Sequence, residues 1–237
     1  MTQFIVDPSF WEVFPEAKIF TLAVENIDNH IDPAKNGEFK RLLRQAFEAA
    51  EDHVALSPFA SNPVIAKWRE AFTRFKKKKG VRSSIEALLK RVDKDSPLSP
   101  INPLVDIYNS ISLTYAVPCG GEDIDKIEGD IHLGKAKGGE PFFPLGAEED
   151  APALPEEICY FDNEGAVCRC FNWREAERTM LTEETTRAAL VIEAIDNESA
   201  EQAKEAIEAL QKAIEDYFGV KGTIKVADKE NPSHQLL

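Results

Sequence analysis

The chain has 237 residues, of which 43% are hydrophobic and 30% are charged, and its formal net charge at pH 7 is −14. A chain of this length can bury a full core as one large globular domain or two small ones. No stretch approaches the roughly 18 consecutive apolar residues of a membrane span, and the start, MTQFIVDPSFWEVF, lacks the basic and apolar parts of a secretory signal. We therefore expect a cytoplasmic protein without a membrane partner.

The predicted elements of the first half are one strand and four helices. Residues 19–27 (IFTLAVENI) are rich in β-branched and aromatic residues, which favour a strand. The helices are indicated by apolar residues at helical spacing, by Ser or Asn caps and by proline at the first helical position. They are expected within residues 33–56, 61–75, 83–92 and 102–117.

The second half is predicted to consist of strands and one long helix. Glycines alternating with short apolar pieces indicate strands and tight turns, and the sequence DNEG between two apolar runs predicts a hairpin. The long helix is expected to have Ser199 as its cap and Gly219 as its terminator, and the last residues read as a loose tail. These segments are the strands within 119–146, the hairpin 157–173, the strand 188–196, the helix 198–219, an edge strand 221–228 and the tail 230–237.

No internal repeat and no long linker divides the chain. We therefore expect a single domain over residues 1–237, of the mixed α/β (α+β) class, with helices packed on a mixed β-sheet.

The four cysteines favour free thiols. Cys119, Cys159, Cys168 and Cys170 are too few and too closely spaced for a disulfide framework. A zinc site built from the last three with His132 is an alternative, although the paired C-x2-C spacing is lacking. The sequence also lacks a nucleophile elbow, a Walker loop, a dinucleotide fingerprint and an H-E-x-x-H pair. We expect no metal and no cofactor.

The charge is unevenly distributed along the chain. Between Lys67 and Lys94, eleven basic residues stand against three acidic ones, and the rest of the chain is strongly acidic. The acidic remainder disfavours indiscriminate binding to polyanions such as DNA. The basic segment, above all Lys76, Lys77, Lys78 and Lys79, suits the positioning of a specific RNA. The alternative is that FKKKKG is a solvated helix end, where the helix dipole favours lysine.

Three short runs resemble a known family. The order GVRSSIEALL, DIYNSISL and IEGDI resembles the B3/B4 domain of the bacterial phenylalanyl-tRNA synthetase β subunit, and the whole chain looks more like the freestanding B3/B4-domain proteins. The resemblance covers residues 68–195. Residues 1–67 then form an N-terminal extension of strand and helices, and residues 199–218 form a C-terminal helix.

The resemblance implies a tRNA-binding module of protein biosynthesis. In the synthetase this module hydrolyses tyrosine wrongly esterified to the phenylalanine tRNA. The matching positions imply that Arg82 helps to hold the tRNA end, that Asn109 lies in the pocket, and that Glu193 recognises the tyrosine hydroxyl. The synthetase pattern has a histidine where this chain has Gly120, so hydrolysis of the synthetase kind is not implied.

Glu193 is also unusual on the residues alone, because it lies within the apolar run AALVIEAI. A buried acceptor that phenylalanine leaves unpaired can discriminate against it by about four to five orders of magnitude. The alternative is that Glu193 lies on the solvent face of a half-exposed strand, since side chains alternate between the faces.

Further candidates follow the hairpin. Arg174, Arg178 and Thr179 offer donors suited to a phosphate or a carboxylate; the alternative is that neighbouring glutamates pair with these arginines at the surface. His132 is the candidate catalytic base, and a structural histidine is the alternative. The side chains of Trp68, Trp173 and Tyr115 are candidates for stacking on a base, although Trp68 fits a core position.

Two functions remain open at this stage. The first is a trans-editing ester hydrolase, which is not itself a ligase, that deacylates a mischarged tRNA using bound water. The second is a binding module, without hydrolysis, for an amino acid, a nucleotide or an RNA end. Both expect a tRNA or aminoacyl-tRNA end, or a small molecule related to it, as the partner.

Overall fold

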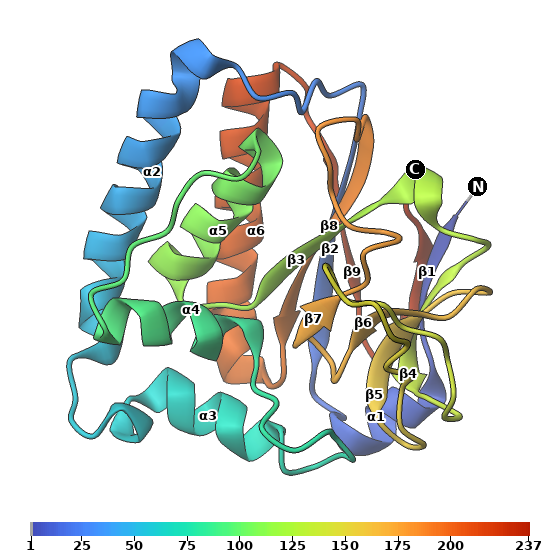
Figure 1. Cartoon of the computed structure of the whole chain (residues 1–237). Helices are drawn as coiled ribbons and strands as arrows, with labels where there is room; N and C mark the ends of the chain where they lie inside the picture. The colour runs from blue at the N-terminus through green and yellow to red at the C-terminus, as the bar shows by residue number, and fades with distance from the viewer. Residues whose placement is uncertain (1) are drawn as a thin grey trace.

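The computed structural model describes residues 2–237 and places the strands in two sheets (Figure 1). The strands are β1 Gln3–Val6, β2 Lys18–Glu25, β3 Cys119–Asp123, β4 Ile131–Lys135, β5 Ile158–Phe161, β6 Ala166–Arg169, β7 Arg174–Glu175, β8 Arg187–Ala194, β9 Thr223–Ala227 and β10 Ser233–Gln235. The four-stranded sheet has the order β3-β8-β2-β9, and the six-stranded sheet has the order β10-β1-β4-β5-β6-β7. Only the β1–β4 pair is parallel among these named strands.

The helices lie mostly in the first half of the chain, as predicted. They are α1 Pro8–Val13, α2 Asn36–Ala49, α3 Pro63–Ala71, α4 Ser84–Asp93, α5 Pro103–Tyr115 and α6 Asn197–Phe218. Proline stands at the first position of α3 and α5, where its missing N–H costs no intrahelical hydrogen bond. Asn102 caps α5 by accepting from the Val105 N–H. The predicted mixed α/β fold in a single domain is confirmed. Within residues 2–237 no helix combines the length and apolarity that a bilayer crossing requires.

The four-stranded sheet is covered on both faces. Figure 1 shows α2, α5 and α6 side by side on one face. Along β8, Leu190 and Ile192 join the apolar cluster that includes α6, whereas Ala189 and Val191 belong to the cluster that includes the six-stranded sheet. Because side chains alternate between the faces of a strand, Glu193 points the same way as Ala189 and Val191, into the space between the two sheets. It does not face solvent.

The end of the chain is ordered, and the predicted loose tail is wrong. Residues of β10 pair with β1, with Phe4 opposite His234. The His234 Nε2 lies 2.7 Å from the Thr21 hydroxyl, and Leu236 is buried in the main core. The β10 strand is only three residues long and polar, so no periodic pattern marks it, and its pairing depends on the exposed edge of β1.

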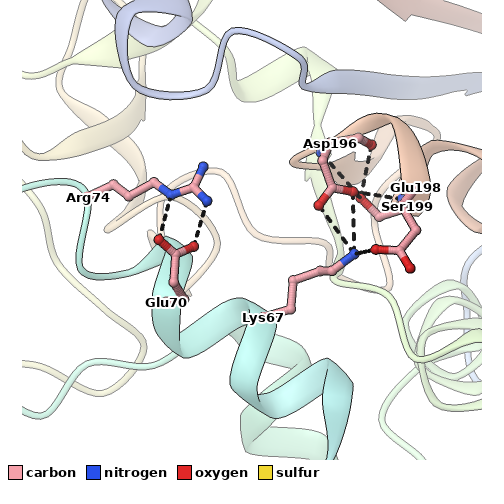
Figure 2. A network of polar contacts seen from close by, with 6 residues as sticks. All are labelled: Lys67, Glu70, Arg74, Asp196, Glu198 and Ser199. Carbon is pink, nitrogen blue, oxygen red and sulfur yellow. Dashed lines mark hydrogen bonds and ion pairs between the residues drawn. The ribbon is translucent and has the colours of Figure 1, made fainter.

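The predicted cap of α6 also needs correction. Asp196 is the N-cap and Ser199 is the third helical residue, and the two side chains form a capping box. Figure 2 shows Lys67 of α3 reaching this helix start, where its Nζ lies 3.2 Å from an Asp196 carboxylate oxygen and 2.7 Å from Glu198. Lys67 therefore belongs to the basic segment in sequence but is paired within the fold.

Candidate functional site

A pocket of about 310 Å³ lies between the two sheets and is closed on one side by α4 and α5. Its wall combines apolar side chains with three carboxyl groups, an amide and an arginine. The polar and charged residues lining it are Ser84, Asn109, Glu122, Asn172, Arg174, Glu175 and Glu193, together with the hydroxyl-bearing Tyr108 and Tyr160. Such a cavity, mostly apolar with a few polar groups pointing into it, is the usual form of a small-molecule site.

Glu193 lies deep in this pocket and is only 4% exposed. Its Oε1 accepts a hydrogen bond from the Tyr160 hydroxyl at 2.9 Å, and its Oε2 accepts one from the Asn172 amide at 3.3 Å. Burial raises the pKa of Glu193 to about 8, although these two donors act in the opposite direction. The interpretation of Glu193 as a solvent-facing residue is therefore wrong. Its acceptor atoms already have partners from the protein itself.

Glu175 of β7 enters the pocket beside Gly120. Its Oε1 accepts a hydrogen bond from the Gly121 N–H at 3.1 Å and would lie 2.8 Å from a Cβ atom at position 120. The Glu175 carboxyl thus occupies space that a side chain at position 120 would enter. Although part of this side chain is accessible, burial of the carboxyl raises its pKa to about 7.

Glu122 of β3 provides the third carboxyl group. The residue is 7% exposed, and its Oε2 makes no hydrogen bond within residues 2–237. Burial raises the pKa of Glu122 well above its usual value, and the nearby Glu175 raises it further. Side chains at positions 120 and 122 of one strand share a face, so Glu122 points toward the side on which Glu175 lies.

The predicted binding residues are divided by the fold. Asn109 and Arg174 line the pocket together with Glu193. The Arg174 guanidinium lies 5.3 Å from the centre of the Trp173 ring. Arg178 instead forms a two-pronged ion pair with Asp162 at 2.8 Å, which fixes the loop between β5 and β6.

Thr179 is fully buried outside the pocket lining. The alternative in which neighbouring glutamates pair with the two arginines is wrong for Arg178, whose partner is Asp162. Among the residues considered for stacking, Trp173 lines the pocket, and Trp68 is a buried core residue as expected.

Arg82 and Lys77 line a separate groove of about 240 Å³, which also includes Arg69 and Glu86. This groove is next to the pocket, because Ser84, Ala87 and Leu88 of α4 line the pocket itself. Lys76, Lys78 and Lys79 are exposed in the preceding loop. Other basic residues of the segment are paired within the fold, with Arg69 bonded to Glu86 and Arg74 bonded to Glu70 (Figure 2).

His132 lies outside the pocket lining, although its neighbour Ile131 is part of it. Its Nδ1 is 2.9 Å from the Asp7 carboxylate, and its ring stacks on Phe161 with 5.5 Å between the ring centres. All four cysteines are buried and free. Within residues 2–237 no three Cys, His, Asp or Glu side chains are placed to hold a metal ion, so the alternative zinc site is not formed.

Sequence reasoning missed four polar residues of the pocket, namely Tyr160, Asn172, Glu122 and Glu175. Each lies in a short strand or at its end among other polar residues, so hydrophobic patterning does not single it out. The glycine pair at 120 and 121 is the one signal in the sequence, because glycine in a strand marks the close approach of another group. Here that group is Glu175.

The fold and the pocket together define a mixed α/β domain with a carboxylate-lined cavity between two sheets. The sequence matches the family described as the B3/4 domain over residues 67–219. This span is more than half of the chain, and the chain belongs to that family. The predicted family is thereby confirmed, and the match extends beyond the predicted 68–195 to include α6.

One similar solved structure is an N-terminal fragment of the phenylalanyl-tRNA synthetase β-subunit from Pyrococcus horikoshii. The two are 14% identical with a TM-score of 0.49, and the alignment covers 93% of this chain and 49% of that one. The chain therefore spans about half the length of that fragment. No curated protein matches the sequence.

Proposed function

We propose that this chain is a cytoplasmic tRNA-binding B3/B4-domain protein whose pocket holds the aminoacyl group at the end of a tRNA. The observation that carries the proposal is the meeting of Asn109, Arg174 and Glu193 at one pocket, although they come from α5, β7 and β8. The exposed lysines that precede α4 lie on the approach to this pocket and suit the phosphates of an RNA end.

As a specific activity we propose trans-editing, the hydrolysis of tyrosine from a mischarged phenylalanine tRNA. A general base works best when its pKa lies near the operating pH. Glu175 meets this condition with a pKa raised to about 7 by burial, and it lies in the pocket, whereas His132 does not. In this proposal Glu175 takes a proton from the attacking water, and Glu193 faces the amino-acid side chain.

The alternative is a binding module without hydrolysis for an amino acid, a nucleotide or an RNA end. Two observations favour it. Both Glu193 oxygens already accept hydrogen bonds from Tyr160 and Asn172, which reduces the penalty for a ligand without a hydroxyl. Gly120 also offers no side chain to the pocket.

Deacylation of purified aminoacyl-tRNA tests the two functions. We expect release of tyrosine from mischarged phenylalanine tRNA but no release of phenylalanine from the correct one. Glu175→Gln should lower the rate by about 100-fold if the carboxyl is the base, and Glu193→Ala should reduce the preference for tyrosine. Glu177→Gln is the matched control, because Glu177 is exposed and outside the pocket. No release by folded protein during a long incubation would favour the binding module.

Charge reversal tests the lysine patch. Replacing Lys76, Lys77, Lys78 and Lys79 with glutamate should weaken tRNA binding at least about tenfold near 0.1 M salt, and the remaining binding should depend less on salt. Reversal of Lys204 and Lys212, which are exposed on α6, is the control and should have a smaller effect. Filter binding across a salt series measures both. Equal affinity of the patch variant and the unmodified protein would remove the patch from the RNA interface.

A further inference from the structure

Three carboxyl groups in one pocket need an explanation that the tyrosine hydroxyl does not supply. Glu122, Glu175 and Glu193 all line it. The only arginine of the lining, Arg174, is exposed and lies over the Trp173 ring. Arg178 is the other guanidinium near Glu122, and it is held by Asp162. Each of the three carboxyl groups lacks an ion pair within 4.0 Å among residues 2–237. The pocket therefore has an excess of acceptors over cationic donors.

Glu122 and Glu175 differ from Glu193 in what they still lack. Glu193 has a neutral donor on each oxygen, which completes its first set of contacts. Glu175 receives one backbone N–H on Oε1. The buried Oε2 of Glu122 receives no hydrogen bond within the described chain. A buried polar atom without a partner is costly, so this atom marks a place for a donor from outside the chain.

Glu122 and Glu175 also approach one another. Glu175 meets the backbone of Gly121, the residue before Glu122, and it lies where a Cβ atom of Gly120 would project. Positions 120 and 122 share a face of β3. Two carboxyl groups on the same side of a cavity form a suitable acceptor pair for a group with several donors and a positive charge.

We propose that the pocket binds ligands through a primary ammonium group, with Glu122 and Glu175 as its acceptors. This inference depends on the proposed function in one respect, since the α-ammonium of an aminoacyl ester is the natural ligand of this class. An ammonium group carries three N–H donors and one charge, which supplies the missing partner of Glu122 and offsets both carboxylates. A bound metal ion is a poorer match, because no three ligating side chains within residues 2–237 converge.

The proposal places the reacting end of the ligand as well as its charge. Glu193 lies on β8, across the cavity from β7 and its Glu175, so an ammonium held by Glu122 and Glu175 leaves the side chain to extend toward the rest of the lining. That lining is mainly apolar and includes Leu88, Val167 and Val191. The ligand class is thus an amino acid with a blocked carboxyl group and an apolar or aromatic side chain.

Calorimetric titration with matched pairs of small amides tests the inference. The pairs are L-tyrosinamide with 3-(4-hydroxyphenyl)propanamide, L-phenylalaninamide with 3-phenylpropanamide, and L-leucinamide with 4-methylpentanamide. Members of a pair differ only in the amino group, which is largely protonated at pH 7. In at least one pair the amine should bind at least about tenfold more tightly, as expected for a charged hydrogen bond in a buried site.

The variants Glu122→Gln and Glu175→Gln should reduce this preference to less than about threefold while leaving the affinity for the amine-free member unchanged, which also shows that the pocket remains folded. Glu177→Gln should keep the full preference. Equal affinity within every pair, a full preference retained in both pocket variants, or no binding of any amide would each overturn the inference. Ammonium preference without deacylation of any tRNA would support this inference while refuting the proposed hydrolysis. Deacylation without ammonium preference would do the reverse.

Discussion

Replacing Glu157 with glutamine is expected to lower the free energy of unfolding by about 3–5 kcal/mol, the usual cost of leaving one member of a buried ion pair unpaired. Glu157 is 0% exposed and Arg169 is 2% exposed. The Arg169 Nε donates to Glu157 Oε1 at 2.9 Å, and its Nη2 donates to Oε2 at 2.7 Å. The glutamate also accepts from the backbone N–H groups of Leu154 and Cys170.

The pair holds the loop before β5 against the end of β6. Burial acts to raise the pKa of Glu157, but the Arg169 guanidinium and the backbone donors bring that pKa below its usual value, so the carboxylate is ionised. Glutamine keeps the shape of the side chain and removes the charge, which leaves the Arg169 guanidinium buried without a counter-charge.

Urea unfolding followed by circular dichroism measures this effect. The control is Asp125→Asn, which breaks the exposed pair between Asp125 and Arg187 at 2.6 Å and should cost less than about 1 kcal/mol. Similar small losses in both variants would show that the Glu157–Arg169 pair contributes no more than a surface ion pair.

The second large effect concerns pH, and it has the opposite sign from that of an ion-paired carboxylate. The pKa values of Glu193 and Glu175 are raised to about 8 and about 7 in the folded protein, above the usual 4.5 that applies after unfolding. Between these limits the folded protein binds more protons than the unfolded chain. The stability from these groups is therefore present below about pH 4.5 and is lost as the pH rises through about 7 to 8.

The variant Glu193→Gln removes one of these titrations. Between about pH 5 and pH 7, the free energy of unfolding of the unmodified protein should fall relative to the variant by about 1.4 kcal/mol per pH unit. Urea unfolding at several pH values measures this difference. Taking the difference cancels the other titrating groups, among them Asp106, with its pKa raised by burial to about 6, and His234, with its pKa lowered by burial to about 4. Parallel pH profiles for the two proteins would contradict the assignment of Glu193 as a protonated buried acid.

The sequence predicted the elements best where one periodic pattern extended over many residues. Helix α6 shows apolar residues at 203, 207, 210 and 214, and the apolar run of β8 is long enough to identify a strand. The short strands β1, β7 and β10 have two to four residues each. A pattern of that length carries no period, and the pairing of these strands depends on edges that only the folded sheet creates.

The pocket was predictable in part and for a clear reason. The resemblance placed Asn109 and Glu193 correctly enough to bring them to one cavity, but it gave no information on Glu175, which replaces the space of a side chain at Gly120. That contact joins residues 54 apart, and no local pattern encodes such a distance. Likewise, alternation along β8 placed Glu193 on one face without revealing that a second sheet covers that face.

The pairing of β2 has a consequence for how the chain folds. Lys18 lies opposite Ala194 on one side of β2, and Ile19 lies opposite Ala227 on the other. Both neighbours of this central strand therefore come from the last quarter of the sequence. Contacts so distant along the chain must overcome a large loop-closure entropy before they stabilise the structure. During synthesis, β2 waits for most of the chain to emerge, and we expect slow folding in which the apolar face of β2 needs protection until β8 arrives.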